Sequence, residues 1–144
     1  MKLTNGQKEA LARKAEMIIS PKRTKKEAEL KENFKLSDET RDFLKKAKKV
    51  AEAVKALQKA VAETGMSLDY NSIRFNFDGC PLYYSLSSKD DMIEVFADNI
   101  KTYRIQKLID KMYPTYQEIM DELELSQLDK TFDLDSFIKK YENL

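Results

Sequence analysis

The sequence of 144 residues contains no histidine, and this absence excludes several catalytic arrangements at once. Without an imidazole, the chain has no histidine general base and no Ser-His-Asp triad. A structural zinc site is excluded as well, because zinc needs several Cys or His ligands and the chain has one cysteine. One cysteine also permits no internal disulfide, which is typical of proteins in a reducing, intracellular compartment.

Glycine and proline are scarce too, with three of each. Gly6, Gly65 and Gly79 are too far apart in the sequence to form a phosphate-binding glycine-rich loop. We therefore expect few tight turns and several long helices. No apolar run approaches the ~20 residues that span a bilayer, and residues 1–20 carry charges throughout. From this we expect no membrane association and a cytoplasmic location.

What the sequence does contain is an uneven distribution of charge. Residues 1–64 hold 17 Lys and Arg against 10 Asp and Glu, whereas residues 65–144 hold 9 against 15. Such a division indicates two surfaces that bind different partners, or two surfaces that face each other. From its length we expect one domain over residues 1–144, with a basic helical half and an acidic half that begins with a β-hairpin.

Two helices are expected in the N-terminal part of the chain. The first ends at about Ile19, because Pro21 disfavours the α conformation of the residue before it. Thr24 and Glu27 have the spacing of a capping box, which predicts a short second helix over about residues 25–33.

The strongest helix signal covers about residues 38–64. Ser37 is a good N-cap, and Gly65 suits the position just after a helix C-terminus. A seam of apolar residues with heptad spacing runs along one side: Phe43, Ala47, Val50, Val54, Leu57 and Val61. We interpret this seam as core packing against a helix at 89–112, and the alternative is a seam between two copies of the chain.

A β-hairpin is expected at about residues 72–87. Two runs that alternate apolar and polar residues surround a loop of four residues, Asp78-Gly79-Cys80-Pro81. The hairpin carries aromatic residues that could stack on nucleic-acid bases, although core packing explains them more simply: Phe75, Phe77, Tyr83 and Tyr84.

Three further helices are expected after the hairpin. Ser88 is the predicted cap of the helix at 89–112, Thr115 that of a helix to about Leu125, and Asp135 that of a last short helix. The predicted fold class is therefore α+β, predominantly α: a helical bundle of about six helices with one hairpin.

Lysine and arginine form the main candidate binding surface. A basic cluster is expected between the first two helices, and a basic stripe on the side of the long helix opposite the seam. The cluster comprises Lys22, Arg23, Lys25 and Lys26, and the stripe comprises Arg41, Lys45, Lys48, Lys49, Lys55 and Lys59. Such rows can neutralise phosphates, although a solvated helix face is their more common role.

A second candidate surface is acidic and lies in the C-terminal half. Its residues could imitate nucleic-acid phosphates toward a basic partner: Asp90, Asp91, Glu94, Asp98, Asp121, Glu122 and Glu124. Acids at helix starts also have a simpler role, because the helix dipole favours negative charge there. We predict no metal or cofactor site, because these carboxylates are not expected to converge from different elements.

These observations favour a non-enzymatic interaction protein that binds and modulates a protein or nucleoprotein partner through charged surfaces. Inhibitors and accessory proteins of phages and mobile elements are of this kind. The first alternative is a nucleic-acid-binding module that uses the basic stripe. The second and weaker alternative is a metal-dependent hydrolase.

Overall fold

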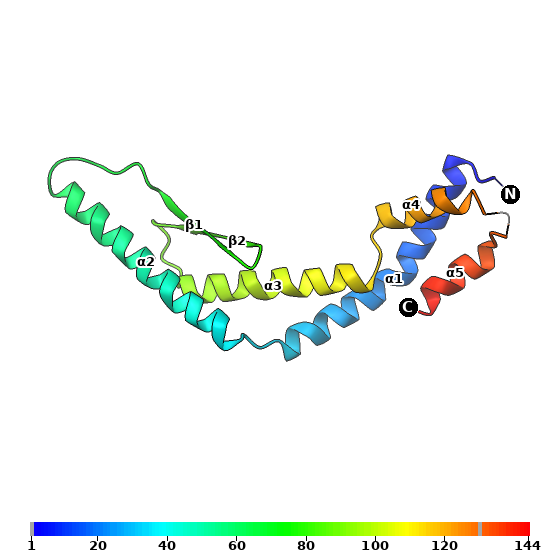
Figure 1. Cartoon of the computed structure of the whole chain (residues 1–144), viewed down its shortest axis with the longest axis horizontal. Coiled ribbons are helices and arrows are strands. Elements are labelled where there is room, and N and C mark those ends of the chain that lie inside the picture. The colour runs from blue at the N-terminus through cyan, green and yellow to red at the C-terminus, as the bar shows by residue number, and fades with distance from the viewer. Residues whose placement is uncertain (1, 130) are drawn as a thin grey trace. The chain divides into compact units, whose positions relative to one another are not determined.

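The computed structural model describes residues 2–129 and 131–144, and these form five helices and one β-hairpin (Figure 1). In chain order the elements are α1 Asn5–Asn33, α2 Asp38–Ala62, β1 Ser72–Phe77, β2 Cys80–Ser85, α3 Met92–Met112, α4 Tyr116–Ser126 and α5 Leu134–Glu142. The predominantly helical α+β class is confirmed, but the described residues form fewer helices than the six or so expected. Over the described part of the chain, no helix is long and apolar enough to cross a membrane.

The chain divides into two compact units. The first combines residues 1–33 with 105–144, and the second consists of residues 34–104. The boundary between them falls inside α3, which begins in the second unit and continues into the first. The units therefore do not coincide with the basic and acidic halves of the sequence, and the single domain stays a prediction.

Helix α1 runs through Pro21 without interruption, so the predicted break between two helices is wrong. Proline weakens a helix interior, because it lacks an N–H and crowds the preceding turn. Contacts on both sides offset this loss. Ile19 is fully buried before the proline, and Lys22 and Arg23 donate hydrogen bonds to backbone carbonyls far along the chain after it. Thr24 consequently caps nothing, and its hydroxyl donates to a carbonyl one turn earlier at 3.1 Å.

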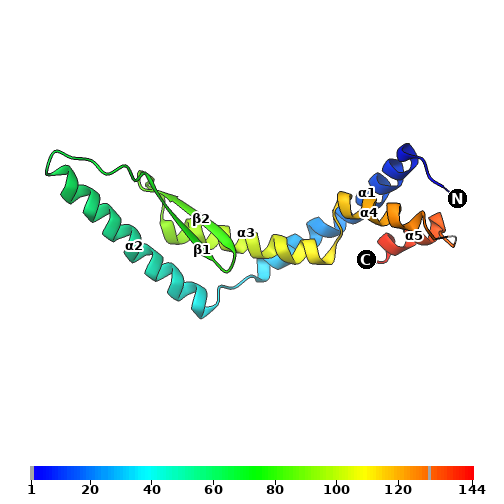
Figure 2. The same cartoon turned by 45° about the horizontal axis from the view of Figure 1, so that its top comes forward.

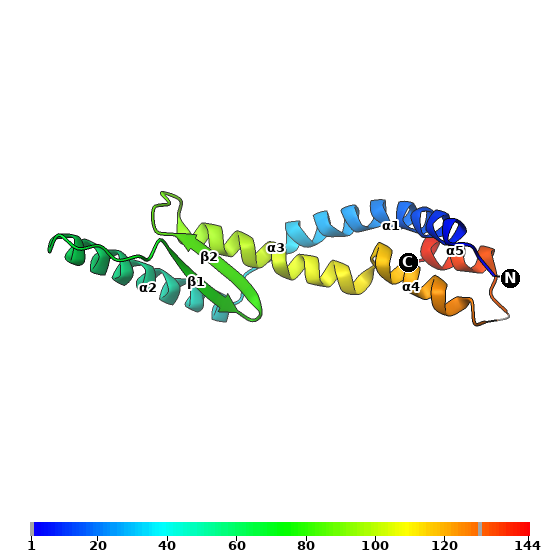
Figure 3. The same cartoon turned by 90° about the horizontal axis from the view of Figure 1, so that it is seen from above.

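The core of the first unit forms where α1 packs against α4 and α5 (Figure 3). Its buried side chains are Leu3, Ala12, Ala15, Ile19, Ile119, Leu123, Phe137 and Tyr141. Thr115 caps α4 as expected, since its side chain accepts from the N–H of Glu118. Asp133, and not Asp135, caps α5, because its extended backbone aims the carboxylate at the N–H groups of the first helical turn.

The charges of the two segments in the first unit are balanced. Residues 1–33 hold 9 Lys and Arg against 5 Asp and Glu, and residues 105–144 hold 5 against 9. Because α1 packs on α4 and α5, the basic N-terminal segment faces the acidic C-terminal segment. Here the charge division of the sequence corresponds to two surfaces that face each other.

In the second unit, one face of the hairpin packs against α2 and the N-terminal part of α3 (Figure 2). This face consists of the paired residues Ile73 and Tyr84, Phe75 and Leu82, and Phe77 and Cys80. The ring of Phe43 on α2 stacks on that of Phe77, with centroids 4.3 Å apart, and the ring of Phe96 on α3 meets Phe75 edge-on. Phe75, Phe77 and Tyr84 therefore pack on the core as the simpler interpretation expected, and Tyr83 lies on the exposed face, which that interpretation took to be an amphipathic rim.

The hairpin closes through a two-residue turn, and not through the four-residue loop that we expected. Asp78 and Gly79 both have positive φ, 50° and 81°, which is the geometry of a type I′ turn. This turn matches the twist of the strands, so Cys80 and Pro81 pair as the first residues of β2.

The buried side of α2 is not the heptad seam. Its buried residues are Thr40, Leu44, Ala47 and Ala51, of which only Ala47 belongs to the seam. This stripe is turned by about 70° from the seam, at ~100° per residue. Ala47 and Ala51 leave room in this stripe for the aromatic side chains of the hairpin that belong to the same core. Val50 and Leu57 of the seam remain 45% and 53% exposed.

Candidate binding surface

The basic stripe lies along one side of α2, and all six of its residues are exposed. Ser37 starts the helix by accepting a hydrogen bond from the N–H of Thr40, and helical geometry then sets the stripe's residues on one side. From Arg41 to Lys59 the stripe extends about 27 Å, at 1.5 Å per residue.

Most of the stripe forms no close ion pair with the residues that the structure describes. Arg41 lies 3.9 Å from the Asp38 carboxylate, but nowhere in residues 2–129 and 131–144 is there a carboxylate within 4.0 Å of four lysines: Lys45, Lys48, Lys49 and Lys59. Lys46, which is not part of the stripe, differs from them. Its hydrogen bond and charge lower the pKa of the Asp42 carboxyl, and the two groups lie 2.8 Å apart.

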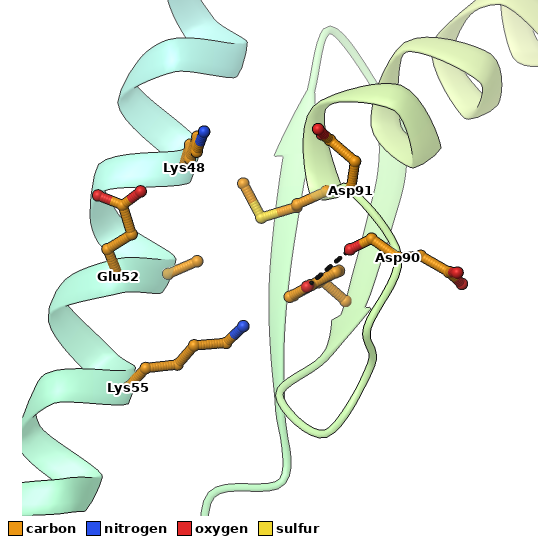
Figure 4. Close-up of a pocket in the computed structure, with 8 residues that line it drawn as sticks. Lys48, Glu52, Lys55, Asp90 and Asp91 are labelled. Carbon is orange, nitrogen blue, oxygen red and sulfur yellow. Dashed lines mark hydrogen bonds between the residues drawn. The ribbon is translucent and has the colours of Figure 1, made fainter.

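Lys48 and Lys55 line a cavity of about 180 Å³ between α2 and the start of α3 (Figure 4). Figure 4 shows Lys48, Glu52 and Lys55 on one wall, and Asp90 and Asp91 across from them. The cavity therefore joins two surfaces that the sequence predicted separately, the basic stripe and part of the acidic set. Figure 4 shows the side chain of Asp90 pointing away from α2, so Asp90 faces the cavity through its backbone oxygen.

Tyr84 also lines this cavity. Its hydroxyl donates to the backbone oxygen of Asp90 at 3.1 Å and lies 3.4 Å from that of Ser88. The Lys55 ammonium lies 5.3 Å from the centroid of the Tyr84 ring, within the range of a cation–π interaction. These contacts hold the loop before α3 against the hairpin and fix one amine of the stripe above the ring.

Asp91 is the cap of α3, where we expected Ser88. Its Oδ1 accepts from the N–H groups of Ile93 and Glu94, at 2.8 and 3.2 Å. Ser88 instead accepts from the N–H of Asp90 in the preceding loop, so α3 begins at Met92 and not at residue 89. Asp91 therefore has a structural role, while Asp90, Glu94 and Asp98 of the predicted acidic set have exposed side chains.

The other predicted acids lie on α4 in the first unit and make contacts there. Glu124 pairs with Lys8, and Asp121 accepts from the side chain of Gln117 at 2.9 Å. Glu122 accepts from Lys140 and from the buried hydroxyl of Tyr141 at 2.6 Å. Burial, together with the hydrogen bond to Glu122, raises the pKa of Tyr141 above its ordinary value.

The basic cluster also lies in the first unit, and two of its four residues hold the C-terminal segment. Lys22 Nζ donates to the carbonyl oxygens of Tyr141, Glu142 and Leu144 near the end of α5. Arg23 donates to the carbonyl of Pro114, just before α4. Lys26 lies 3.8 Å from Glu29, and Lys25 is exposed. The cluster and the stripe thus belong to different units.

Sequence reasoning did not assign Glu52 or Met92 to a binding site and considered Tyr84 only as a residue that could stack on nucleic-acid bases, although all three line the cavity. The alternation of the second strand places Tyr84 on the apolar face, but only the packing of the hairpin on α2 brings it below Lys55. Throughout the residues that the structure describes, no three carboxylate or thiol side chains lie close enough to hold a metal ion.

No family model, curated protein or solved structure shows a significant match to this chain.

Proposed function

We propose that this chain is a non-enzymatic binding protein that engages and modulates a macromolecular partner, a protein or nucleoprotein, through the basic stripe of α2. One observation carries the proposal. Among the described residues, the stripe's lysines are exposed and none has a carboxylate within 4.0 Å, whereas Lys22, Arg23, Glu122 and Glu124 bind groups of their own unit.

The electrostatics of the stripe define the partner's surface. Six cations within about 27 Å on one side of a helix repel one another and concentrate anions around them. An anionic surface relieves that repulsion and releases the condensed ions, so the affinity falls as the salt concentration rises. The contact surface of the partner is therefore acidic or rich in phosphate.

Nucleic acid alone is the second candidate partner, and the length of the stripe supports it. A straight row of one arginine and five lysines over about 27 Å can follow several successive phosphates of one strand. Such contacts position a strand without reading its sequence, which agrees with a stripe of lysines that carries few hydrogen-bonding side chains of other types.

The test compares two charge reversals in the full chain. Lys45→Glu with Lys48→Glu changes the stripe, and Arg13→Glu with Lys14→Glu makes the same change in net charge on an exposed part of α1. Each variant is used to capture the partner from the native host, and the partner is identified by mass. Loss of the partner with the stripe variant alone supports the proposal, and its retention by that variant overturns it.

Gel shifts with single- and double-stranded nucleic acid separate the two candidates. Binding that is tightest at ~50 mM salt and is lost in the stripe variant identifies nucleic acid as the partner. Absence of binding at this salt concentration eliminates the second candidate and leaves the protein or nucleoprotein partner.

A further inference from the structure

The cavity beside Lys48 and Lys55 is too small to enclose a whole ligand molecule. Its volume of about 180 Å³ lies below the roughly 300–1,000 Å³ of sites that hold small molecules. Its walls come from α2, β2 and the start of α3, which all belong to the second unit. A space of this size suits a single side chain of a partner.

Amines are the free charges of this cavity. Lys48 and Lys55 are exposed, and neither has a carboxylate within 4.0 Å among the described residues. Figure 4 shows the Lys55 amine directed toward the hairpin, whereas the Glu52 carboxylate points away from it. The Asp90 side chain points away from α2, and Asp91 Oδ1 accepts two N–H groups of α3. The cavity therefore favours an anionic group.

Apolar atoms make up much of the remaining wall. Ala51, Met92 and Tyr84 line the cavity and are 4%, 6% and 6% exposed. Such walls favour the methylene groups of an entering side chain, and the amines favour its charged end. Together they match a short aliphatic stem that ends in a carboxylate.

We propose that the cavity binds one glutamate or aspartate side chain of a protein partner. This inference rests on the proposed function, and it selects protein over nucleic acid as the partner of the basic stripe. A phosphate within a strand is bonded to a sugar on both sides, so it can lie along the stripe but cannot enter a cavity of this size. A carboxylate on a flexible stem can enter and accept charge-assisted hydrogen bonds from Lys48 and Lys55.

Methyl NMR of the full chain, labelled with ¹³C at the methionine methyl groups, tests the location. A short polyglutamate peptide is the probe. We expect its addition to shift the Met92 resonance and to leave that of Met66 unchanged, because Met66 is 65% exposed and lies outside the cavity. Binding of the peptide without a shift of Met92, or no binding, overturns the proposal.

Two double variants separate the cavity from the stripe as a whole. Lys48→Gln with Lys55→Gln removes the cavity's amines, and Lys45→Gln with Lys59→Gln removes two amines of the stripe outside it. Calorimetry should show an affinity for the peptide about tenfold lower for the first variant, and a smaller loss for the second. Circular dichroism confirms that both remain folded.

Equal losses in the two variants would mean that the peptide responds only to the net charge of the stripe. That result overturns the cavity site and leaves the proposed function intact, which the capture of the native partner decides separately. An oligothymidylate strand of the same net charge as the peptide provides the second arm. It should leave the Met92 resonance unchanged, and a shift of Met92 with the strand overturns the choice of a carboxylate.

Discussion

The Lys8 ammonium lies 2.5 Å from the Glu124 carboxylate and joins the start of α1 to the end of α4. The two side chains differ in environment, with 10% of Lys8 exposed and 60% of Glu124. A buried amine is thus neutralised by a carboxylate that reaches in from solvent. The pair connects the basic N-terminal segment with the acidic C-terminal segment, which lie at opposite ends of the sequence.

Removing the carboxylate of this pair should destabilise the protein. Glu124→Gln leaves the Lys8 ammonium buried without a counter-charge, and we expect a loss of about 1–2 kcal/mol in unfolding free energy, limited by the exposure of Glu124. Urea denaturation followed by circular dichroism measures the change.

Lys8→Met provides the control for the pair. It removes the buried charge together with its desolvation penalty and keeps most of the apolar stem, so its effect should be smaller than that of Glu124→Gln. If Glu124→Gln leaves the denaturation midpoint unchanged, the pair makes no contribution to stability.

Lys22 should be a structural residue, although the sequence placed it in a basic binding cluster. Lys22→Met removes a cation from three carbonyl oxygens near the end of α5, and we expect a loss of about 1–2 kcal/mol. Lys25→Met, at the exposed neighbour, should change stability by less than about 0.5 kcal/mol. Thermal unfolding of the two variants compares them, and equal melting temperatures would argue against this role.

The hairpin turn should require glycine at position 79. Gly79→Ala forces a β-carbon into a backbone with φ of 81°, which should lower stability by about 1–2 kcal/mol. Asp78→Asn is the matched control, because asparagine tolerates the left-handed conformation that Asp78 adopts with φ of 50°. Chemical denaturation should show a clear loss for the first variant and almost none for the second.

The stability of the first unit should fall in alkaline solution because of Tyr141. Burial, then the hydrogen bond and charge of Glu122, raise its pKa above the ordinary 10.0. At pH values below this ordinary pKa, the Tyr141 hydroxyl is protonated in both the folded and the unfolded chain. The stabilisation from its hydrogen bond to Glu122 is then fully present. Above this pKa the unfolded chain loses the proton first, so stability decreases as the pH rises.

Tyr141→Phe isolates this contribution from the titration of lysines. At neutral pH the variant should be less stable by about 1 kcal/mol, because it lacks the hydrogen bond to Glu122. The difference from wild type should shrink above pH ~10, the ordinary tyrosine pKa. Urea titrations at several pH values measure this difference, and a constant difference would contradict the assignment.

Short sequence patterns correctly predicted where a helix begins when its cap depends only on neighbouring residues. Ser37 and Thr115 cap α2 and α4 as expected, because an N-cap needs only a side-chain oxygen and the next turn of backbone. The break at Pro21 was wrong, because the burial of Ile19 and the distant carbonyls bound by Lys22 outweigh the local preference.

The candidate surface was predictable only in part. The spacing of the lysines in α2 places them on one side of any straight helix, so the basic stripe follows from the sequence. That Lys48 and Lys55 meet Asp90 across a cavity does not follow, since these residues are more than 30 positions apart and only the hairpin between them sets the distance.

By itself, the sequence determined the helical class, the hairpin, the basic stripe and the absence of histidine chemistry, because each depends on composition or on spacing within one element. Only the tertiary structure decided which charges remain available for a partner. It joined the basic α1 to the acidic α4 and α5, and it turned Ala51 rather than Val50 into the core. The reason is physical: burial and ion pairing depend on which segments fold against each other, and the spacing of residues within one segment does not determine this.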